Sequence, residues 1–180
     1  MRSRGRSGAA VGFTLIELLV VIAIVGILFA IVVPFALRGI ENGRAATCMS
    51  NLRQLGMGLS AYLGDHDMTM PVLKGGRAKL TEDEPVIDKV FRPYLKDIRI
   101  LACPSDPKYA KETGTSYFWN TALNGQHIGS LDFLRMTQEL SRIPVAMDKE
   151  GFHPYLKNKV NMLYADGHAT KDLKFTSAPE

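Results

Sequence analysis

The sequence has 180 residues, of which 22 are lysine or arginine and 18 are aspartate or glutamate, giving a formal charge of +4. Three of the arginines, Arg2, Arg4 and Arg6, lie at the start of the chain, before any acidic residue. The rest of the chain has 19 basic and 18 acidic side chains, and this nearly neutral charge gives no case for a nucleic-acid-binding protein. The sequence also lacks a Gly-rich phosphate loop and a CxxC pair, which argues against the common nucleotide-binding and redox motifs.

The first predicted element is a membrane-spanning helix. Residues 13–33 form an apolar run of 21 residues in which Glu17 is the one charged side chain. At ~1.5 Å of rise per residue, a helix of that length crosses a hydrocarbon core of roughly 30 Å. The arginines before it predict that the start of the chain stays in the cytoplasm and the bulk is exported. A carboxylate in such a run costs about 2.5 kcal/mol or more if placed centrally, so we expect a cation from a neighbouring copy to pair with it.

The helical pattern is interrupted by Pro34, which predicts a kink or local melting between residues 33 and 43. Beyond it, apolar residues recur at spacings of four and three and define one stripe of an amphipathic helix. The stripe consists of Cys48, Leu52, Leu55, Leu59 and Tyr62. We expect it to pack on a sheet of the same chain, with contact to another subunit as the alternative. Gly64 is a plausible stop signal for this helix.

The rest of the chain predicts a small α+β head with an antiparallel sheet. A capping-box pattern at 81–84 predicts a helix whose apolar face spans residues 86–95, and residues 131–140 are a second helix candidate. The predicted strands are 97–102, 115–119, 143–147, 160–164 and 169–175. Asp166-Gly167 lies between the last two and predicts a β-hairpin. Because a lone hairpin is unstable in water, the long helix must complete the core.

The stretch GFTLIELLVVIAIVGIL, which starts at Gly12, resembles the prepilin signal of type IV pilins and type II secretion pseudopilins. The resemblance implies that a membrane peptidase cuts after Gly12 and methylates the new terminus at Phe13. It also implies that Glu17 neutralises the terminal amine of the adjacent subunit. In the family that the chain resembles, a proline at the place of Pro34 marks a stretch that loosens in the filament, although a simple kink explains that residue equally well.

The resemblance divides the chain into four parts. These are a leader (1–12), a transmembrane and filament-core helix (13–34), an amphipathic helix (35–64) and the α+β head (65–180). Further motifs, Cys103-Pro104-Ser105-Asp106, Ser116-Tyr117 and Asn161–His168, resemble a bacterial subgroup of prepilin-type proteins. That subgroup is named for a histidine followed at about nine residues by Asp-Gly. Here twelve residues separate His153 from Asp166, which leaves the role of His153 open.

Two kinds of site in the head are open from the sequence. Cys48 and Cys103 either form a disulfide, which an exported domain can keep, or remain two free thiols. For a metal, the weak candidates are Asp166 and His168; other potential ligands are Asp65, His66, Asp67, Asp148 and His153. The resemblance implies calcium in a head loop of major pseudopilins, but no segment has the alternating acidic pattern of a calcium loop. We therefore expect no cofactor and a structural turn at Asp166-Gly167.

The predicted function is that of a prepilin-like subunit of a type IV pilus or a type II secretion pseudopilus, which acts by polymerising. The sequence contains no serine elbow and no HExxH pair, so no motif of these kinds indicates an enzyme. The implied partners are the prepilin peptidase, other pilin or pseudopilin subunits, the inner-membrane assembly platform and membrane lipid. The implied location is the bacterial inner membrane, with the head in the periplasm or outside the cell. Two alternatives are a monomeric anchored binding protein and a metal-dependent exported enzyme.

Overall fold

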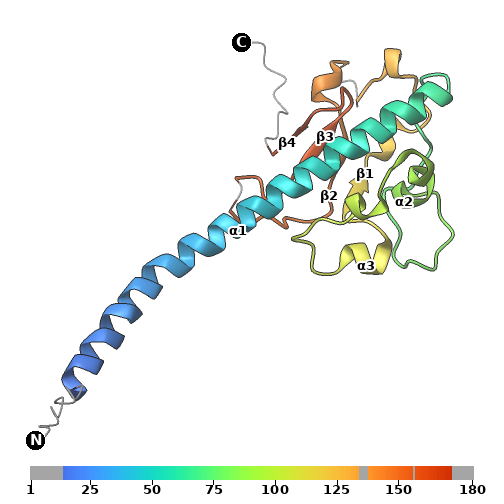
Figure 1. The fold of residues 1–180 in the computed structure, drawn as a ribbon. Helices are drawn as coiled ribbons and strands as arrows, with labels where there is room; N and C mark the ends of the chain where they lie inside the picture. The colour runs from blue at the N-terminus through green and yellow to red at the C-terminus, as the bar shows by residue number, and fades with distance from the viewer. Residues whose placement is uncertain (1–13, 134–137, 156, 172–180) are drawn as a thin grey trace, which may run out of the picture. The chain divides into compact units, whose positions relative to one another are not determined.

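The computed structural model describes residues 14–133, 138–155 and 157–171. The chain divides into two compact units, Met1–Gly39 and Ile40–Glu180. One long helix, α1 (Leu15–Asp65), forms the described part of the first unit and the first element of the second, as Figure 1 shows. The predicted long amino-terminal helix is therefore confirmed.

In the first unit, the side chains of α1 face outward on every side of the helix. Every residue from 14 to 39 is exposed, including Leu28 at 56% and Phe29 at 61%. This is the one helix in the described residues that is long and apolar enough to cross a membrane. The helix continues without interruption through Pro34, so of the two alternatives predicted there the local melting is not found, while the kink stays a prediction.

In the second unit, the predicted stripe of α1 is buried and forms one wall of the core. Cys48, Leu52 and Leu55 are fully shielded from solvent, Leu59 is nearly so, and Tyr62 is half-buried. Most of the polar residues between them are exposed, as the spacing of 3.6 residues per turn requires, whereas Asn51 is buried and its side-chain amide donates to the Ala102 carbonyl oxygen at 3.1 Å. The prediction that the stripe packs within its own chain is confirmed, and the helix ends at Asp65, one residue beyond Gly64.

The sheet has four antiparallel strands in the order β1-β2-β3-β4. They are β1 (Tyr117–Trp119), β2 (Pro144–Asp148), β3 (Met162–Tyr164) and β4 (Ala169–Thr170). The hairpin between β3 and β4 turns at Gly167, whose φ of +87° favours glycine. The strands predicted near 115–119, 143–147 and 160–164 and the Asp-Gly hairpin are confirmed, and with them the predicted α+β fold. Of the strand predicted over 169–175, residues 169–170 form β4, and residues 172–175 lie outside the described residues.

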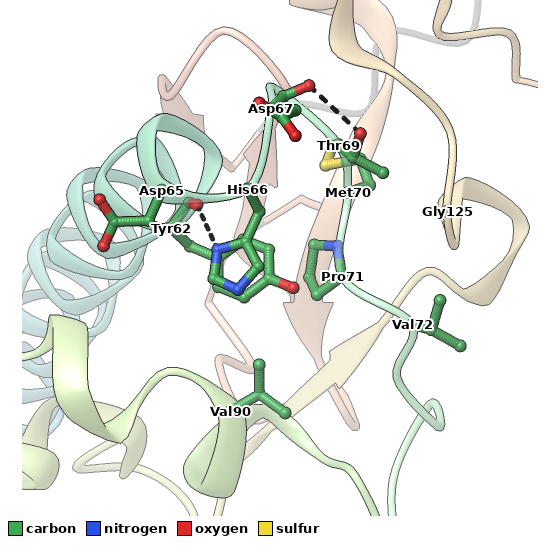
Figure 2. A pocket seen from close by; sticks show the side chains of 10 residues that line it. All are labelled: Tyr62, Asp65, His66, Asp67, Thr69, Met70, Pro71, Val72, Val90 and Gly125. Atoms are coloured by element: carbon green, nitrogen blue, oxygen red, sulfur yellow. Dashed lines mark hydrogen bonds between the residues drawn. The ribbon is translucent and has the colours of Figure 1, made fainter.

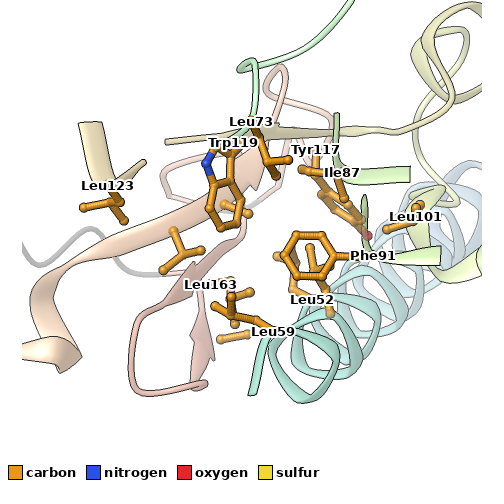
Figure 3. Close-up of a cluster of buried hydrophobic side chains, with 14 of the residues drawn as sticks. Leu52, Leu59, Leu73, Ile87, Phe91, Leu101, Tyr117, Trp119, Leu123 and Leu163 are labelled. Carbon is orange, nitrogen blue, oxygen red and sulfur yellow. The ribbon is translucent and has the colours of Figure 1, made fainter. Parts of the chain in front are cut away.

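The core lies between the sheet and the second half of α1. Figure 3 shows Phe91, Leu52 and Leu163 among its members, and the Phe91 and Trp119 rings lie 5.8 Å apart at their centroids. Leu163 of β3 also approaches α1 closely, because a Cβ atom added to Gly56 would lie 3.0 Å from its Cδ1 atom. The helix therefore supplies the apolar surface that the short strands need to be stable.

The local predictions for the middle of the chain are partly wrong. The predicted strand 97–102 is instead a 3-10 helix, Ile98–Leu101, because the Asp97 side chain accepts a hydrogen bond from the Arg99 amide at 2.9 Å and turns the backbone. The helix expected over 86–95 is shorter: α2 (Ile87–Val90) is followed by a 3-10 turn (Arg92–Tyr94) that contains Pro93.

The predicted capping box is also wrong, because the residue before α2 is Val86 and no side chain caps that helix. A short helix that was not predicted, α3 (Tyr109–Thr113), precedes β1. The helix candidate 131–140 lies partly outside the described residues, and residues 131–133 are not helical.

Candidate functional site

The first candidate site is the start of α1, where Thr14 and Glu17 cap the helix reciprocally. The Glu17 carboxylate accepts hydrogen bonds from the Thr14 amide at 2.9 Å and from the Thr14 hydroxyl at 2.7 Å. In return, the Thr14 hydroxyl accepts a hydrogen bond from the Glu17 amide at 3.3 Å. This is a capping box, in which two otherwise unpaired amides at the helix start are satisfied.

The sequence carries the signal for this cap, although the cap was not among the predicted features. A threonine followed three residues later by glutamate, directly before an apolar run, is the capping-box pattern. Glu17 therefore already has hydrogen-bond donors within its own chain, although they leave its negative charge uncompensated. The predicted processing residues, Gly12 and Phe13, lie outside the described residues.

The second candidate site is a buried cluster in the second unit. Its four members are Cys48, Cys103, Asp148 and His153, and their ligand atoms all lie within 4.8 Å of one another. Cys48 comes from α1, Cys103 follows the 3-10 helix Ile98–Leu101, Asp148 ends β2, and His153 lies in the loop before β3. Elsewhere in the ranges that the structure describes, no three His, Cys, Asp or Glu side chains meet in this way.

The contacts within this cluster are short and directed. The Cys48 thiol donates to Asp148 Oδ1 at 3.1 Å, and Cys103 Sγ lies 3.5 Å from His153 Nε2. The same Nε2 atom lies 3.5 Å from Asp148 Oδ2. Both cysteines are free thiols here, and their sulfur atoms lie within 4.8 Å. The two cysteines are thus near each other, while the disulfide remains a prediction.

Burial and mutual contact shift the pKa of each group. Burial raises the pKa of Asp148 to about 6, although hydrogen bonds from Asn161 and Cys48 oppose this. The interaction of Cys103 with the Cys48 thiol lowers the pKa of Cys103 to about 5, and His153 adds to that effect against the cost of burial. The same interaction, then burial and the nearby Asp148 charge, raise the pKa of Cys48. Negative charge is therefore favoured on Cys103.

A second ring of polar groups holds the cluster in place. Glu41 Oε1 lies 3.1 Å from His153 Nδ1 and also accepts a hydrogen bond from the Ser105 hydroxyl. The Asn161 amide donates to Asp148 Oδ2 at 2.7 Å. Burial lowers the pKa of His153, but contacts with Cys103 and Glu41 outweigh this and raise the pKa overall. The role of His153 was open from the sequence. Its Nδ1 atom contacts the Glu41 carboxylate, and its Nε2 atom faces Cys103 and Asp148.

The Cys103-Pro104-Ser105-Asp106 motif builds the wall beside this cluster. The Asp106 carboxylate accepts hydrogen bonds from the backbone amides of Lys108, Tyr109 and Ala110, and from the Ser116 hydroxyl at 2.6 Å. The Ser116 hydroxyl in turn accepts a hydrogen bond from the Cys103 amide at 2.8 Å. Two motifs, Cys103–Asp106 and Ser116-Tyr117, therefore fix the position of Cys103.

The weak metal candidates from the sequence, Asp166 and His168, lie at the hairpin turn. His168 Nδ1 is 2.5 Å from Asp166 Oδ1, and the His168 ring stacks on the Tyr164 ring at 4.6 Å. No third ligand joins them within the described chain. Asp166 and His168 therefore contact each other within the turn between β3 and β4.

The other candidates, Asp65, His66 and Asp67, line an open pocket of about 600 Å³ beyond the end of α1. In Figure 2 the Asp65 and Asp67 carboxylates point away from each other, and the His66 ring stacks on Tyr62 at 3.8 Å. The His66 Nδ1 atom is 2.9 Å from the Tyr62 carbonyl oxygen. These three side chains therefore do not converge on one ion.

Comparisons with known proteins bear on both units. Residues 12–33 match the prokaryotic N-terminal methylation motif. The chain is 34% identical over 136 residues to type II secretion system core protein G of Pectobacterium carotovorum subsp. carotovorum, covering 74% of this chain and 80% of that protein. It is 32% identical to the core protein G of Klebsiella michiganensis, over 53% of this chain and 66% of that protein. The core protein G of Escherichia coli is 33% identical, over 53% and 65%. No solved structure matches.

Proposed function

The chain belongs to the family of type II secretion system core protein G, and we propose that it is a structural subunit of a type II secretion pseudopilus. It would act by polymerising through its amino-terminal helix after a prepilin peptidase has removed residues 1–12. The observation that carries this proposal is the exposed apolar surface of the first unit, which finds no partner within the described chain. Such a surface is stable only in lipid or against other helices.

The charge at the start of α1 supports a contact between subunits. Cleavage after Gly12 creates a terminal amine at Phe13, four residues before Glu17. Thr14 satisfies hydrogen bonds of the Glu17 carboxylate but brings no positive charge. The terminal amine of an adjacent subunit would supply that charge. Removing one partner from such a buried pair typically costs about 3–5 kcal/mol.

The location that fits these features is the inner membrane, with the amino terminus in the cytoplasm and the second unit exported. Arg2, Arg4 and Arg6 favour this orientation by the positive-inside rule. The partners would be the prepilin peptidase, other pseudopilin subunits, the assembly platform of the inner membrane and lipid. We propose no catalytic role. The clustered ionisable side chains of the second unit, Cys48, Cys103, Asp148 and His153, are buried and so are not accessible to a substrate.

The test separates the charge of Glu17 from its capping role. Glu17→Gln removes the charge but keeps an acceptor that can close a capping box with Thr14. Thr14→Val removes the hydroxyl and keeps the charge. We expect Glu17→Gln to abolish assembly of filaments, seen by electron microscopy and by cross-linking through cysteines introduced into residues 15–33. Thr14→Val should still assemble.

A matched control is Glu84→Gln, which removes a surface carboxylate whose partner is Lys74 in the second unit. It should leave assembly unchanged. Normal assembly of Glu17→Gln would contradict the pairing role. A wild-type protein that gives no cross-linked ladder would contradict polymerisation itself and favour a monomeric anchored protein. Gly12→Ala should leave the leader attached, as the mass of the intact chain would show.

A further inference from the structure

We propose that Cys48, Cys103, Asp148 and His153 form a structural metal site for a thiophilic divalent cation, with zinc as the best fit. This site goes beyond the proposed function and does not depend on it. All four side chains are shielded from solvent: Cys48 and His153 are 0% exposed, and Cys103 and Asp148 are 3% exposed. Two sulfurs, one imidazole and one carboxylate make up a ligand set of the kind that zinc binds in proteins.

The spacing of the ligand atoms matches a tetrahedral ion. Zinc binds sulfur at ~2.3 Å and nitrogen or oxygen at ~2.0–2.2 Å, so neighbouring ligand atoms around it lie roughly 3.3–3.8 Å apart. Cys48 Sγ lies 3.1 Å from Asp148 Oδ1, and His153 Nε2 lies 3.5 Å from both Cys103 Sγ and the other Asp148 oxygen, Oδ2. With one ligand atom taken from each residue, all four lie within 4.8 Å of one another. An ion at the centre would therefore need only small shifts of these side chains.

The orientation of His153 is that of a metal ligand. Its Nε2 atom faces Cys103 and Asp148, while its Nδ1 atom lies 3.1 Å from the Glu41 carboxylate. Histidine ligands commonly donate their second nitrogen to a carboxylate in this way, which fixes the ring and its tautomer. Asp148 is held similarly, because Asn161 donates to it from both its backbone amide and its side chain. The outer groups thus orient both ligands before an ion binds.

The charge of the cluster also favours an ion. When a divalent cation binds, the Cys48 thiol releases its proton to solvent, and Cys103, on which negative charge is already favoured, binds as the thiolate. Two thiolates, one carboxylate and one neutral imidazole around a divalent ion carry a net charge of −1, the same as a Cys₃His site. Four protein ligands and no exposed face leave no position for substrate, which indicates a structural site. Burial of the Asp148 carboxylate carries a desolvation cost, which hydrogen bonds from Cys48 and Asn161 offset in part and a cation would offset further.

A disulfide between the two cysteines explains less of this arrangement. It would use two of the four groups and give no reason for the convergence of Asp148 and His153 on the same point. A metal ion uses all four and joins three parts of the chain that are distant in the sequence: α1 with Cys48, the segment after the 3-10 helix Ile98–Leu101 with Cys103, and residues 148–153 with Asp148 and His153. The ion would thereby fasten the second half of α1 to the sheet.

The experiment uses the full chain, purified in detergent under reducing conditions. We expect about one zinc per chain by elemental mass spectrometry, retained through dialysis. Replacing zinc with Co²⁺ should give the visible bands of tetrahedral cobalt and a thiolate-to-metal charge-transfer band. Cys103→Ser and His153→Gln should lose the ion, and Glu41→Gln should weaken zinc binding by about 10–100-fold.

His168→Gln is the matched control, because His168 also pairs with a carboxylate but lies at the hairpin turn outside the cluster. It should keep the zinc. The cobalt spectrum of the wild-type chain shows tetrahedral geometry and thiolate coordination even if the variants unfold. Glu17→Gln should bind zinc normally, so failure to assemble and failure to bind metal are separate results. A reduced wild-type chain without zinc, a cobalt spectrum without thiolate bands, or a Cys48–Cys103 disulfide in the native protein would each overturn the proposal.

Discussion

The two halves of α1 have similar apolar residues but opposite environments. Leu28, in the first unit, is 56% exposed, whereas Leu55, in the second unit, is fully buried. The difference comes from pattern, because residues 15–33 are apolar around the whole circumference and the later stripe occupies one face. A helix that is apolar all round needs partners outside its own chain, and an amphipathic one can be satisfied within it.

The glycines of α1 show the same contrast. A Cβ atom added to Gly26 would meet nothing within 4 Å, whereas at Gly56 it would lie 3.0 Å from Leu163 Cδ1 and 3.2 Å from the Gly167 carbonyl oxygen. Gly56 is therefore part of the packing between helix and hairpin. Gly26 has no close neighbour of this kind within the described chain. In a filament, it would allow the backbone of a second helix to approach closely.

The largest difference between the two halves of α1 is expected in the free energy of unfolding, when a leucine in each half is replaced by alanine. Leu55→Ala should lower the free energy of unfolding of the second unit by about 2–5 kcal/mol, because it leaves a cavity in the core. Leu28→Ala should leave that free energy unchanged. Urea unfolding of the full chain in detergent, followed by Trp119 fluorescence, measures both. Equal effects of the two variants would contradict the division into two units.

A smaller effect is expected from the glycines. Gly56→Ala should destabilise the second unit by about 1–3 kcal/mol, since the added methyl group crowds Leu163 and the hairpin backbone. Gly26→Ala should leave the stability of the second unit as it is, and the same urea experiment tests it. If Gly56→Ala proved neutral, the hairpin would have to lie farther from α1 than the structure places it.

Asp106 tests a helix cap inside the second unit and adds a dependence on pH. Burial raises its pKa, but the Ser116 hydroxyl and three backbone amides outweigh this and hold the pKa below its usual value. A depressed pKa stabilises the folded state above the pKa of the unfolded chain, and this contribution disappears as pH falls through the folded-state pKa. Asp106→Ala should cost about 1–2 kcal/mol at pH 7.

The stability gap between wild type and Asp106→Ala should narrow as pH is lowered from 7 to 3. Thermal unfolding at both values of pH measures it. A gap that stays constant would mean that the ionised carboxylate is not what stabilises α3.

The smallest effect is expected at the cap of the first unit. Thr14→Ala removes one side of the capping box and should cost the start of α1 about 0.5–2 kcal/mol. Amide hydrogen exchange of residues 15–18 in detergent micelles should become faster, while exchange in the second unit is unchanged. A change confined to the second unit would contradict the local role of Thr14.

The sequence by itself determined the features that depend on local patterns. The apolar run, the stripe from Cys48 to Tyr62 and the Asp166-Gly167 hairpin follow from spacing and turn residues, because neighbours along the chain set them. The capping box at Thr14 belongs to the same class, because its two side chains are three residues apart, although it was not predicted. The prediction of a strand at 97–102 was wrong because one side-chain hydrogen bond from Asp97 outweighed a weak alternating pattern.

Only the tertiary structure decided how the distant residues of the head meet. Cys48, Cys103 and the Asp148–His153 region come from three distant parts of the sequence, and no spacing between those parts predicts a common site. Among the metal candidates taken from the sequence, Asp148 and His153 converge, while Asp65, Asp67, Asp166 and His168 do not join them. The reason is physical: sheet pairing and the packing of α1 bring these segments together, and both depend on contacts between residues far apart in the chain.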